Sequence, residues 1–232
     1  MGVTMPQNTM APAELANYFD HTLLKADAKK QDFEKLCAEA REHEFAMVAI
    51  NPAPVALCAD LLKGTSVHVG AAISFPLGQN TIAQKVAEAA SAIADGADEI
   101  DYVINISELR DGNWTYVERE MSAMVDVCHG AEVLCKTILE TCYLTDSEKI
   151  SVATIAKDVK PDFVKTSTGF GAGGATPHDV ELLAKTVDGS VQVKASGGVR
   201  TLDDALTYID LGATRLGSSS SVAILKEFEN AR

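Results

Sequence analysis

Short apolar runs alternate with amphipathic segments along most of the chain. Eight of these runs are rich in β-branched residues, and most are apolar on both faces, which is typical of a parallel sheet that helices cover. They are residues 18–22, 47–51, 68–75, 99–105, 133–140, 163–168, 191–196 and 214–218. Helical periodicity follows the runs, so the pattern predicts repeated βα units.

Helix signals lie between the predicted strands. Thr176 followed by Pro177 is typical of a helix start, and Thr145 with Glu148 forms a capping-box pattern. One apolar stripe predicts the buried face of a helix; its members are Ile82, Val86, Ala90 and Ile93.

Eight βα units in 232 residues fit a single (β/α)8 TIM barrel, a fold of roughly 250 residues. A doubly wound open sheet is the alternative, because periodicity does not show closure. We expect residues 1–10 to form a flexible tail and residues 11–232 to form the barrel domain. In such a barrel, catalytic residues lie at the carboxyl ends of the strands.

The composition disfavours several classes of binding partner. The net charge of −13 disfavours nucleic acid and membranes, whose phosphates an acidic surface repels. The five cysteines form no CxxC pair, so we expect free thiols and a cytoplasmic protein. The five histidines show no metal-ligand spacing, and no dinucleotide or P-loop motif stands at a strand end. We therefore expect no metal and no cofactor, and a structural role for His21.

Three lysines are spaced 29 residues apart on successive predicted strands. They are Lys136, Lys165 and Lys194, with Asp101 on the preceding strand and Glu140 at a strand end. The even spacing predicts equivalent places on the three strands. A single lysine at a strand end usually extends to solvent, but three together indicate a site. Burial favours a neutral amine, which can attack a carbonyl and form a Schiff base.

Glycine and serine follow the last predicted strands, at residues 196–200 and 217–221, and Thr168-Gly169 follows the sixth. Barrels often bind phosphate in the loops after strands seven and eight. Backbone amides can approach an anion closely where glycine leaves room. The loops therefore predict a local anion site on an acidic protein.

At these residues the chain closely resembles the deoxyribose-phosphate aldolases, a family of metal-free class I aldolases. The similarity runs from residues 20–25 to the Gly217 loop. Its most specific segments are DEIDYVIN around Asp101, LCKTILET around Lys136, FVKTSTGF around Lys165, VKASGGVR around Lys194 and RLGSSS around Gly217. Five such segments in the same order make chance agreement implausible.

The resemblance implies a role for each matching residue. Lys165 would form the imine, and Lys194 would lie beside it and lower its pKa. Asp101 would move protons with Lys194 and water, and Lys136 would belong to the same polar network. Asp20 and Thr22 would meet sugar hydroxyls. The positions implied around the phosphate are Gly169, Gly197, Gly198, Val199, Arg200, Gly217, Ser219 and Ser220.

The implied reaction is reversible cleavage of 2-deoxy-D-ribose 5-phosphate to D-glyceraldehyde 3-phosphate and acetaldehyde, in deoxyribose phosphate catabolism. The resemblance also implies a homodimer or homotetramer. Phe170 stands where some relatives carry a lysine, so one phosphate cation is missing here. Two alternatives remain open: a transaldolase-type Schiff-base barrel, and a sugar-phosphate binding protein without catalysis.

Overall fold

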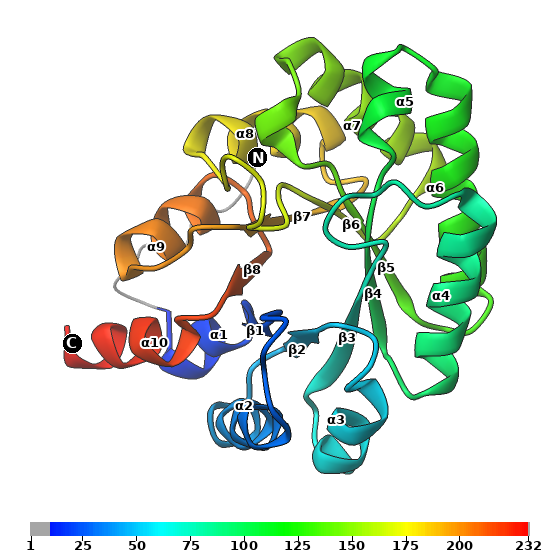
Figure 1. The fold of residues 1–232 in the computed structure, drawn as a ribbon. Helices are drawn as coiled ribbons and strands as arrows, with labels where there is room; N and C mark the ends of the chain where they lie inside the picture. Colours follow the sequence, from blue (N-terminus) through cyan, green and yellow to red (C-terminus); the bar gives the residue numbers. More distant parts are fainter. Residues whose placement is uncertain (1–9, 232) are drawn as a thin grey trace.

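The computed structural model describes residues 10–231, and eight parallel strands form a closed barrel within them (Figure 1). The strands are β1 (Phe19–Leu23), β2 (Met47–Ile50), β3 (His68–Ile73), β4 (Glu99–Val103), β5 (Leu134–Ile138), β6 (Phe163–Lys165), β7 (Gln192–Ser196) and β8 (Arg215–Ser218). Pairing of β1 with β8 closes the sheet. The predicted TIM barrel is confirmed, and the open sheet is wrong.

Helices surround the barrel and connect its strands (Figure 1). They are α1 (Pro12–Ala16), α2 (Lys30–His43), α3 (Val55–Leu62), α4 (Ile82–Ala94), α5 (Ile106–Arg110), α6 (Trp114–His129), α7 (Asp146–Val159), α8 (Pro177–Val187), α9 (Leu202–Asp210) and α10 (Ser221–Asn230), with a short 3-10 helix at Thr141–Tyr143. Thr176 caps α8, and Thr145 with Glu148 caps α7. Both predicted helix starts are confirmed.

The predicted stripe on α4 is confirmed in part, because Val86 and Ile93 pack against the core. Lys85, Ala89 and Ala92 are buried, whereas Ala90 is exposed. The Lys85 ammonium lies 2.8 Å from Glu120 of α6 and donates to the Val103 carbonyl at 2.6 Å. A buried ion pair therefore lies on the face of α4 that packs against α6. Hydrophobic periodicity alone could not identify this pair.

The strand register corrects the expectation that the three lysines are equivalent. Lys165 pairs with Lys194, as the spacing predicts. Lys136 pairs instead with Phe163, two residues before Lys165. The strands of a closed barrel are staggered, so equal spacing in sequence does not give equal height. Lys136 consequently lies deeper in the barrel, with its nitrogen 5.8 Å from the centre of the Phe163 ring.

Apolar residues fill the layer between the strands and the helices. Cys135 belongs to this layer. Its side chain points away from that of Lys136, because successive side chains of a strand lie on opposite faces. Met10, the last residue of the predicted tail, packs against the same core, and positions 1–9 lie outside the described residues. Among the described helices, none is long and apolar enough to cross a membrane.

Candidate active site

Asp101 lies at the centre of the charged barrel interior and contacts all three predicted lysines. Its Oδ1 is 2.7 Å from Lys136 Nζ, and its Oδ2 is 2.7 Å from Lys165 Nζ and 2.6 Å from Lys194 Nζ. Each of these four side chains is at most 5% exposed. Contacts between strands β4, β5, β6 and β7 therefore bring the four predicted catalytic residues together.

A ring of ion pairs surrounds this centre. Lys194 also contacts Asp20, and Arg215 Nη1 lies 2.6 Å from Asp20. Arg215 Nη2 lies 3.3 Å from Glu99, which contacts Lys136 in turn. The ring joins three carboxylates to three cations, so it is balanced without Lys165. The Lys165 ammonium would thus be a surplus positive charge.

The pKa values follow from this arrangement. Burial, opposed by Asp101 and reinforced by Lys194, lowers the pKa of Lys165 to about 8. Burial acts on Lys136 as well, but Asp101 and Glu99 together raise the pKa of that amine above its usual range. The three lysines outweigh burial and hold the pKa of Asp101 well below the usual range. Near neutral pH, Lys165 is the lysine that most readily becomes a nucleophile.

The glycine-rich loops meet at the barrel mouth. A Cβ built on Gly197 would lie 3.1 Å from the Cα of Gly174 and 3.3 Å from that of Gly169, and all three residues follow strand β6 or β7. Gly217 lies inside β8, where a Cβ would lie 2.7 Å from the Cβ of Ser196. A Cβ at Gly217 would therefore require its neighbours to shift, and at Gly197 the φ of +85° also favours glycine.

The remaining predicted phosphate residues lie in the loops after β7 and β8. Gly198, Arg200 and Ser219 are exposed. Val199 is 3% exposed, and its carbonyl accepts from Ser218 Oγ at 2.7 Å. Ser220 precedes α10, whose amino end therefore opens near these loops. Exposed backbone and side-chain donors thus lie where the sequence predicts them.

The two β1 residues that the resemblance places near the sugar both have partners within the protein. Asp20 is completely buried and engaged by Lys194 and Arg215. Thr22 is partly buried, and its hydroxyl donates to the Asp20 carbonyl at 2.8 Å. Asp20 therefore positions Lys194 in this structure. His21 lies 3.0 Å from Glu39 and 3.3 Å from Ser221 Oγ, in agreement with the structural role predicted for it.

Two residues of the interior, and one contact at the barrel mouth, were not identified from the sequence. Glu99 precedes Asp101 by two positions and shares its face, which is a signal that strand alternation provides. Arg215 opens β8, and nothing in the sequence indicates that it bridges two carboxylates. Glu140 was noted at its strand end, but not its contact with Thr168.

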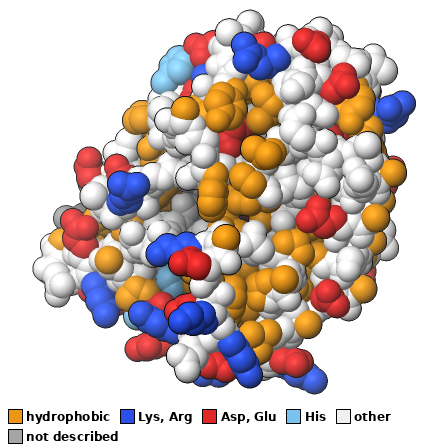
Figure 2. Space-filling model, viewed as in Figure 1, with side chains coloured by type: hydrophobic (Ala, Val, Ile, Leu, Met, Phe, Trp, Pro, Cys, Tyr) orange, Lys and Arg blue, Asp and Glu red, His pale blue; other side chains and the backbone are white. Residues whose placement is uncertain are grey.

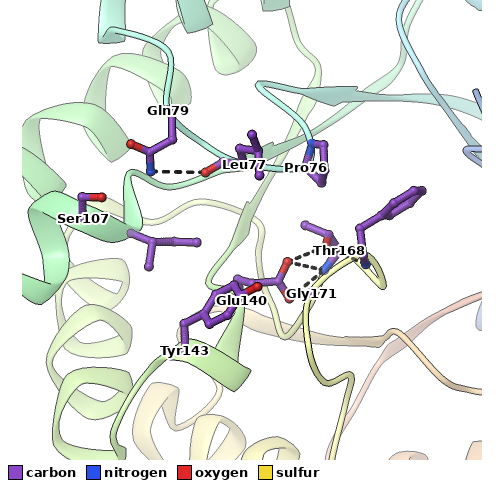
Figure 3. Close-up of a pocket in the computed structure, with 10 residues that line it drawn as sticks. Pro76, Leu77, Gln79, Ser107, Glu140, Tyr143, Thr168 and Gly171 are labelled. Atoms are coloured by element: carbon purple, nitrogen blue, oxygen red, sulfur yellow. Dashed lines mark hydrogen bonds between the residues drawn. The ribbon is translucent and has the colours of Figure 1, made fainter.

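A cavity of about 220 Å³ opens at the barrel mouth (Figure 3). Its lining includes Leu77, Tyr143 and Phe170, which are 70%, 45% and 56% exposed. Figure 2 shows hydrophobic side chains gathered near the middle of the face viewed in Figure 1. Glu140 and Thr168 also line the cavity and face each other.

One group in the described part of the chain has the composition of a metal site. Asp146, His178 and Asp179 place their ligand atoms within 4.8 Å of one another. Lys149 Nζ already lies 2.6 Å from Asp179 and 3.2 Å from Asp146. This ammonium supplies the positive charge that the carboxylates need, so the group does not fit a metal ion.

Comparison with known proteins gives a consistent result. The model of the DeoC/LacD family aldolases matches residues 15–227. A protein of Bacteroides thetaiotaomicron named deoxyribose-phosphate aldolase is 53% identical over 94% of this chain and 92% of its own length. One from Lactobacillus acidophilus with the same name is 51% identical over 91% and 89%. The solved tetrameric deoxyribose phosphate aldolase of Aeropyrum pernix has a TM-score of 0.89 at 31% identity, covering 96% of this chain and 94% of its own.

Proposed function

Because the chain belongs to the DeoC/LacD aldolase family, we propose that it cleaves 2-deoxy-D-ribose 5-phosphate reversibly to D-glyceraldehyde 3-phosphate and acetaldehyde. The chain is thus an aldolase, a carbon–carbon lyase. The relatives that are about half identical to it carry the name of this activity. The structural observation that supports the proposal is the buried amine of Lys165, 2.7 Å from Asp101, with its pKa lowered to about 8.

The proposed chemistry begins with the neutral amine of Lys165. The amine attacks the C1 aldehyde of the open-chain sugar, and loss of water from the carbinolamine forms an imine. Removal of the C3 hydroxyl proton then breaks the C2–C3 bond, and the bond electrons form an enamine while D-glyceraldehyde 3-phosphate leaves. A proton added at C2 converts the enamine to an imine, and water hydrolyses that imine to acetaldehyde and free Lys165.

Asp101 and Lys194 are placed to move the protons in these steps. Both Lys165 and Lys194 contact Oδ2 of Asp101, at 2.7 and 2.6 Å. A proton that Lys165 gives up can therefore pass to the adjacent Asp101 carboxylate, which also contacts the amine of Lys194. We propose that this pair, with water, acts as the acid and base of the reaction. Lys136 holds the other carboxylate oxygen and fixes its orientation.

We assign the 5-phosphate to the loops after β7 and β8. Gly197 and Gly198 both have φ of +85°, which exposes backbone amides that a side chain would cover. Arg200 adds an exposed cation. Phe170 supplies none, so the phosphate is held mainly by backbone and hydroxyl donors.

Borohydride trapping tests the nucleophile. We expect reduction in the presence of acetaldehyde to add an ethyl group to Lys165, located by peptide mass spectrometry. The Lys165→Leu variant should show no adduct, and its melting temperature should match that of the wild type. An adduct that persists in this variant would assign the nucleophile to another residue. A folded wild-type protein without an adduct would favour the binding-protein alternative.

Substrate identity requires a separate measurement, because a transaldolase-type enzyme would also form an imine. We expect release of acetaldehyde from 2-deoxyribose 5-phosphate, detected by coupled reduction. Transfer of a dihydroxyacetone unit between sugar phosphates, without acetaldehyde release, would support the transaldolase-type alternative.

We further propose a homo-oligomer in the cytoplasm. The structural relative from Aeropyrum pernix is described as tetrameric, which supports a homodimer or homotetramer for this chain. All five cysteines are free, as is usual in a reducing compartment. Size-exclusion chromatography with light scattering tests the assembly, and a monomeric mass would contradict it.

A further inference from the structure

Glu140 is a buried acid at the barrel mouth, directly beside the residues that follow Lys165. It is 1% exposed, and its carboxylate accepts from the Thr168 hydroxyl and, at 3.3 Å on both oxygens, from the Thr168 N–H (Figure 3). The Thr168 hydroxyl in turn accepts from the Phe170 N–H at 3.0 Å. One carboxylate therefore organises the turn from Thr168 to Phe170.

The backbone holds Glu140 in an unusual conformation. Its φ and ψ are 54° and 61°, the left-handed region that residues other than glycine rarely adopt. The residues on either side of Glu140 are held by hydrogen bonds to the end of β6 and to the residue that follows β6. Leu139 N–H donates to the Lys165 carbonyl and Thr141 N–H donates to the Thr166 carbonyl, each at 2.9 Å. This conformation turns the side chain of Glu140 toward Thr168. Conformations of this kind persist where the surroundings enforce them and gather at functional sites.

The surroundings of the carboxylate contain hydrogen-bond donors but no paired cation. Among residues 10–231, no lysine, arginine or histidine forms an ion pair with Glu140, whereas Asp20, Glu99 and Asp101 all have such partners. Gly171 packs against it, since a Cβ there would lie 3.2 Å from the Glu140 carboxyl carbon. Burial raises the pKa of Glu140 above its usual range, although the hydrogen bonds from Thr168 and the more distant charge of Lys165 oppose that effect. Burial of this acid is therefore costly, and stability does not explain it.

We propose that Glu140 is a positioning residue for the phosphate group of the substrate. Its carboxylate holds the Thr168–Phe170 turn in the shape that presents Gly169 beside Gly197 at the mouth. Gly169 has φ of +85°, and a Cβ on it would lie 3.6 Å from the Cα of Gly197. The inference rests on the proposed function, because it assumes that these two glycines border the phosphate.

Phosphate binding and imine formation depend on different residues of the site. Glu140 contacts the turn and makes no contact with Asp101, whose partners are the three lysines. Loss of its carboxylate should therefore disorder the phosphate contacts and leave imine formation intact. A phosphorylated sugar should be affected, and a sugar without phosphate should not.

The experiment compares 2-deoxyribose 5-phosphate with 2-deoxyribose as substrates of wild type, Glu140→Ala and Glu140→Gln. For Glu140→Ala we expect KM for the phosphorylated sugar to rise about tenfold or more, the size typical of lost hydrogen bonds to a charged group. Its kcat, and kcat/KM for 2-deoxyribose, should stay near wild type. Glu140→Gln retains one acceptor oxygen and should lie between the two.

Two controls complete the design. Gln79→Ala alters a residue that lines the same cavity and whose amide donates to the Leu77 carbonyl, so the ratio of the two substrates should not change. Thr168→Val should weaken binding of the phosphorylated sugar, and adding Glu140→Gln to it should cost less than Glu140→Gln alone. Such non-additivity is expected of residues in one contact.

The outcomes distinguish this inference from the proposed function. Equal losses on both sugars, an unchanged KM for the phosphorylated sugar, or additive effects of Glu140→Gln and Thr168→Val would each overturn the role of Glu140. A wild-type protein that prefers neither sugar would overturn it as well. The proposed function itself fails if the wild type releases no acetaldehyde from 2-deoxyribose 5-phosphate.

Discussion

Replacement of Lys194 by methionine should raise the pKa of Lys165 and slow imine formation near neutral pH. The two amines lie 2.6 and 2.7 Å from the same oxygen of Asp101, so their nitrogens are within roughly 5 Å of each other. At an effective dielectric constant of about 20, two charges at that distance repel by about 3 kcal/mol, or about 2 pKa units. Methionine preserves most of the volume and removes the charge.

The size of the effect follows from the fraction of neutral amine. With a pKa of about 8, about a quarter of Lys165 is neutral at pH 7.5, whereas a pKa of about 10 leaves less than about one per cent. Asp20 would also lose Lys194 and keep only Arg215 as a partner, and its less compensated charge acts in the same direction. We expect imine formation at pH 7.5 to slow by about two orders of magnitude.

The assay is the rate of borohydride trapping with acetaldehyde, measured from pH 6 to pH 10.5. The wild-type profile should have its midpoint near pH 8 and the Lys194→Met profile should have it near pH 10. The alkaline plateau of the variant should lie below that of the wild type, because Lys194 also takes part in proton transfer. Lys149→Met is the matched control, because Lys149 pairs with Asp179 outside the barrel interior. An unchanged or lowered midpoint in Lys194→Met would refute the electrostatic role of Lys194.

Three further predictions concern stability and packing. Lys85→Met should lower the free energy of unfolding by about 3–5 kcal/mol in urea titration, because it leaves the Glu120 carboxylate buried without its cation; adding Glu120→Leu should recover most of that loss. Gly217→Ala should lower the melting temperature, by an amount that corresponds to a loss of about 1–3 kcal/mol in the free energy of unfolding. It should also reduce kcat, since the new Cβ would lie 2.7 Å from a side chain of β7 and 3.4 Å from Lys194 Cε. Folding lowers the pKa values of Glu99 and Asp101. The two carboxylates therefore stabilise the folded state at a pH above their unfolded pKa values of about 4, and this stabilisation is lost as the pH falls below those values. Urea unfolding between pH 7 and pH 3 measures the loss, and a free energy of unfolding that does not change with pH would contradict it.

Local pattern was sufficient for the elements and for much of the chemistry. Apolar runs with intervening helical periodicity predicted all eight strands, because burial on both faces demands such runs in a covered parallel sheet. Lys165 and Lys194 were identifiable because an ammonium inside an apolar strand is costly and therefore conspicuous. The capping residues Thr145 and Thr176 act on amides three positions away, so sequence alone contains that signal.

Pairing between distant strands decided the rest. The stagger of the strands sets Lys136 beside Phe163 rather than beside Lys165, and no spacing reveals that offset. Arg215 and Asp20 are separated by 195 residues, and Glu140 and Thr168 by 28. Their partnerships exist only after the barrel closes.

The sequence by itself therefore determined which side chains face the barrel interior, because alternation along a strand is a local property. Only the tertiary structure decided which charges neutralise each other there. Electrostatic energy depends on the distances between groups on different strands, and those distances come from register and closure. The lowered pKa of Lys165 is a consequence of its burial inside the closed barrel, which Asp101 opposes and the neighbouring amine of Lys194 reinforces.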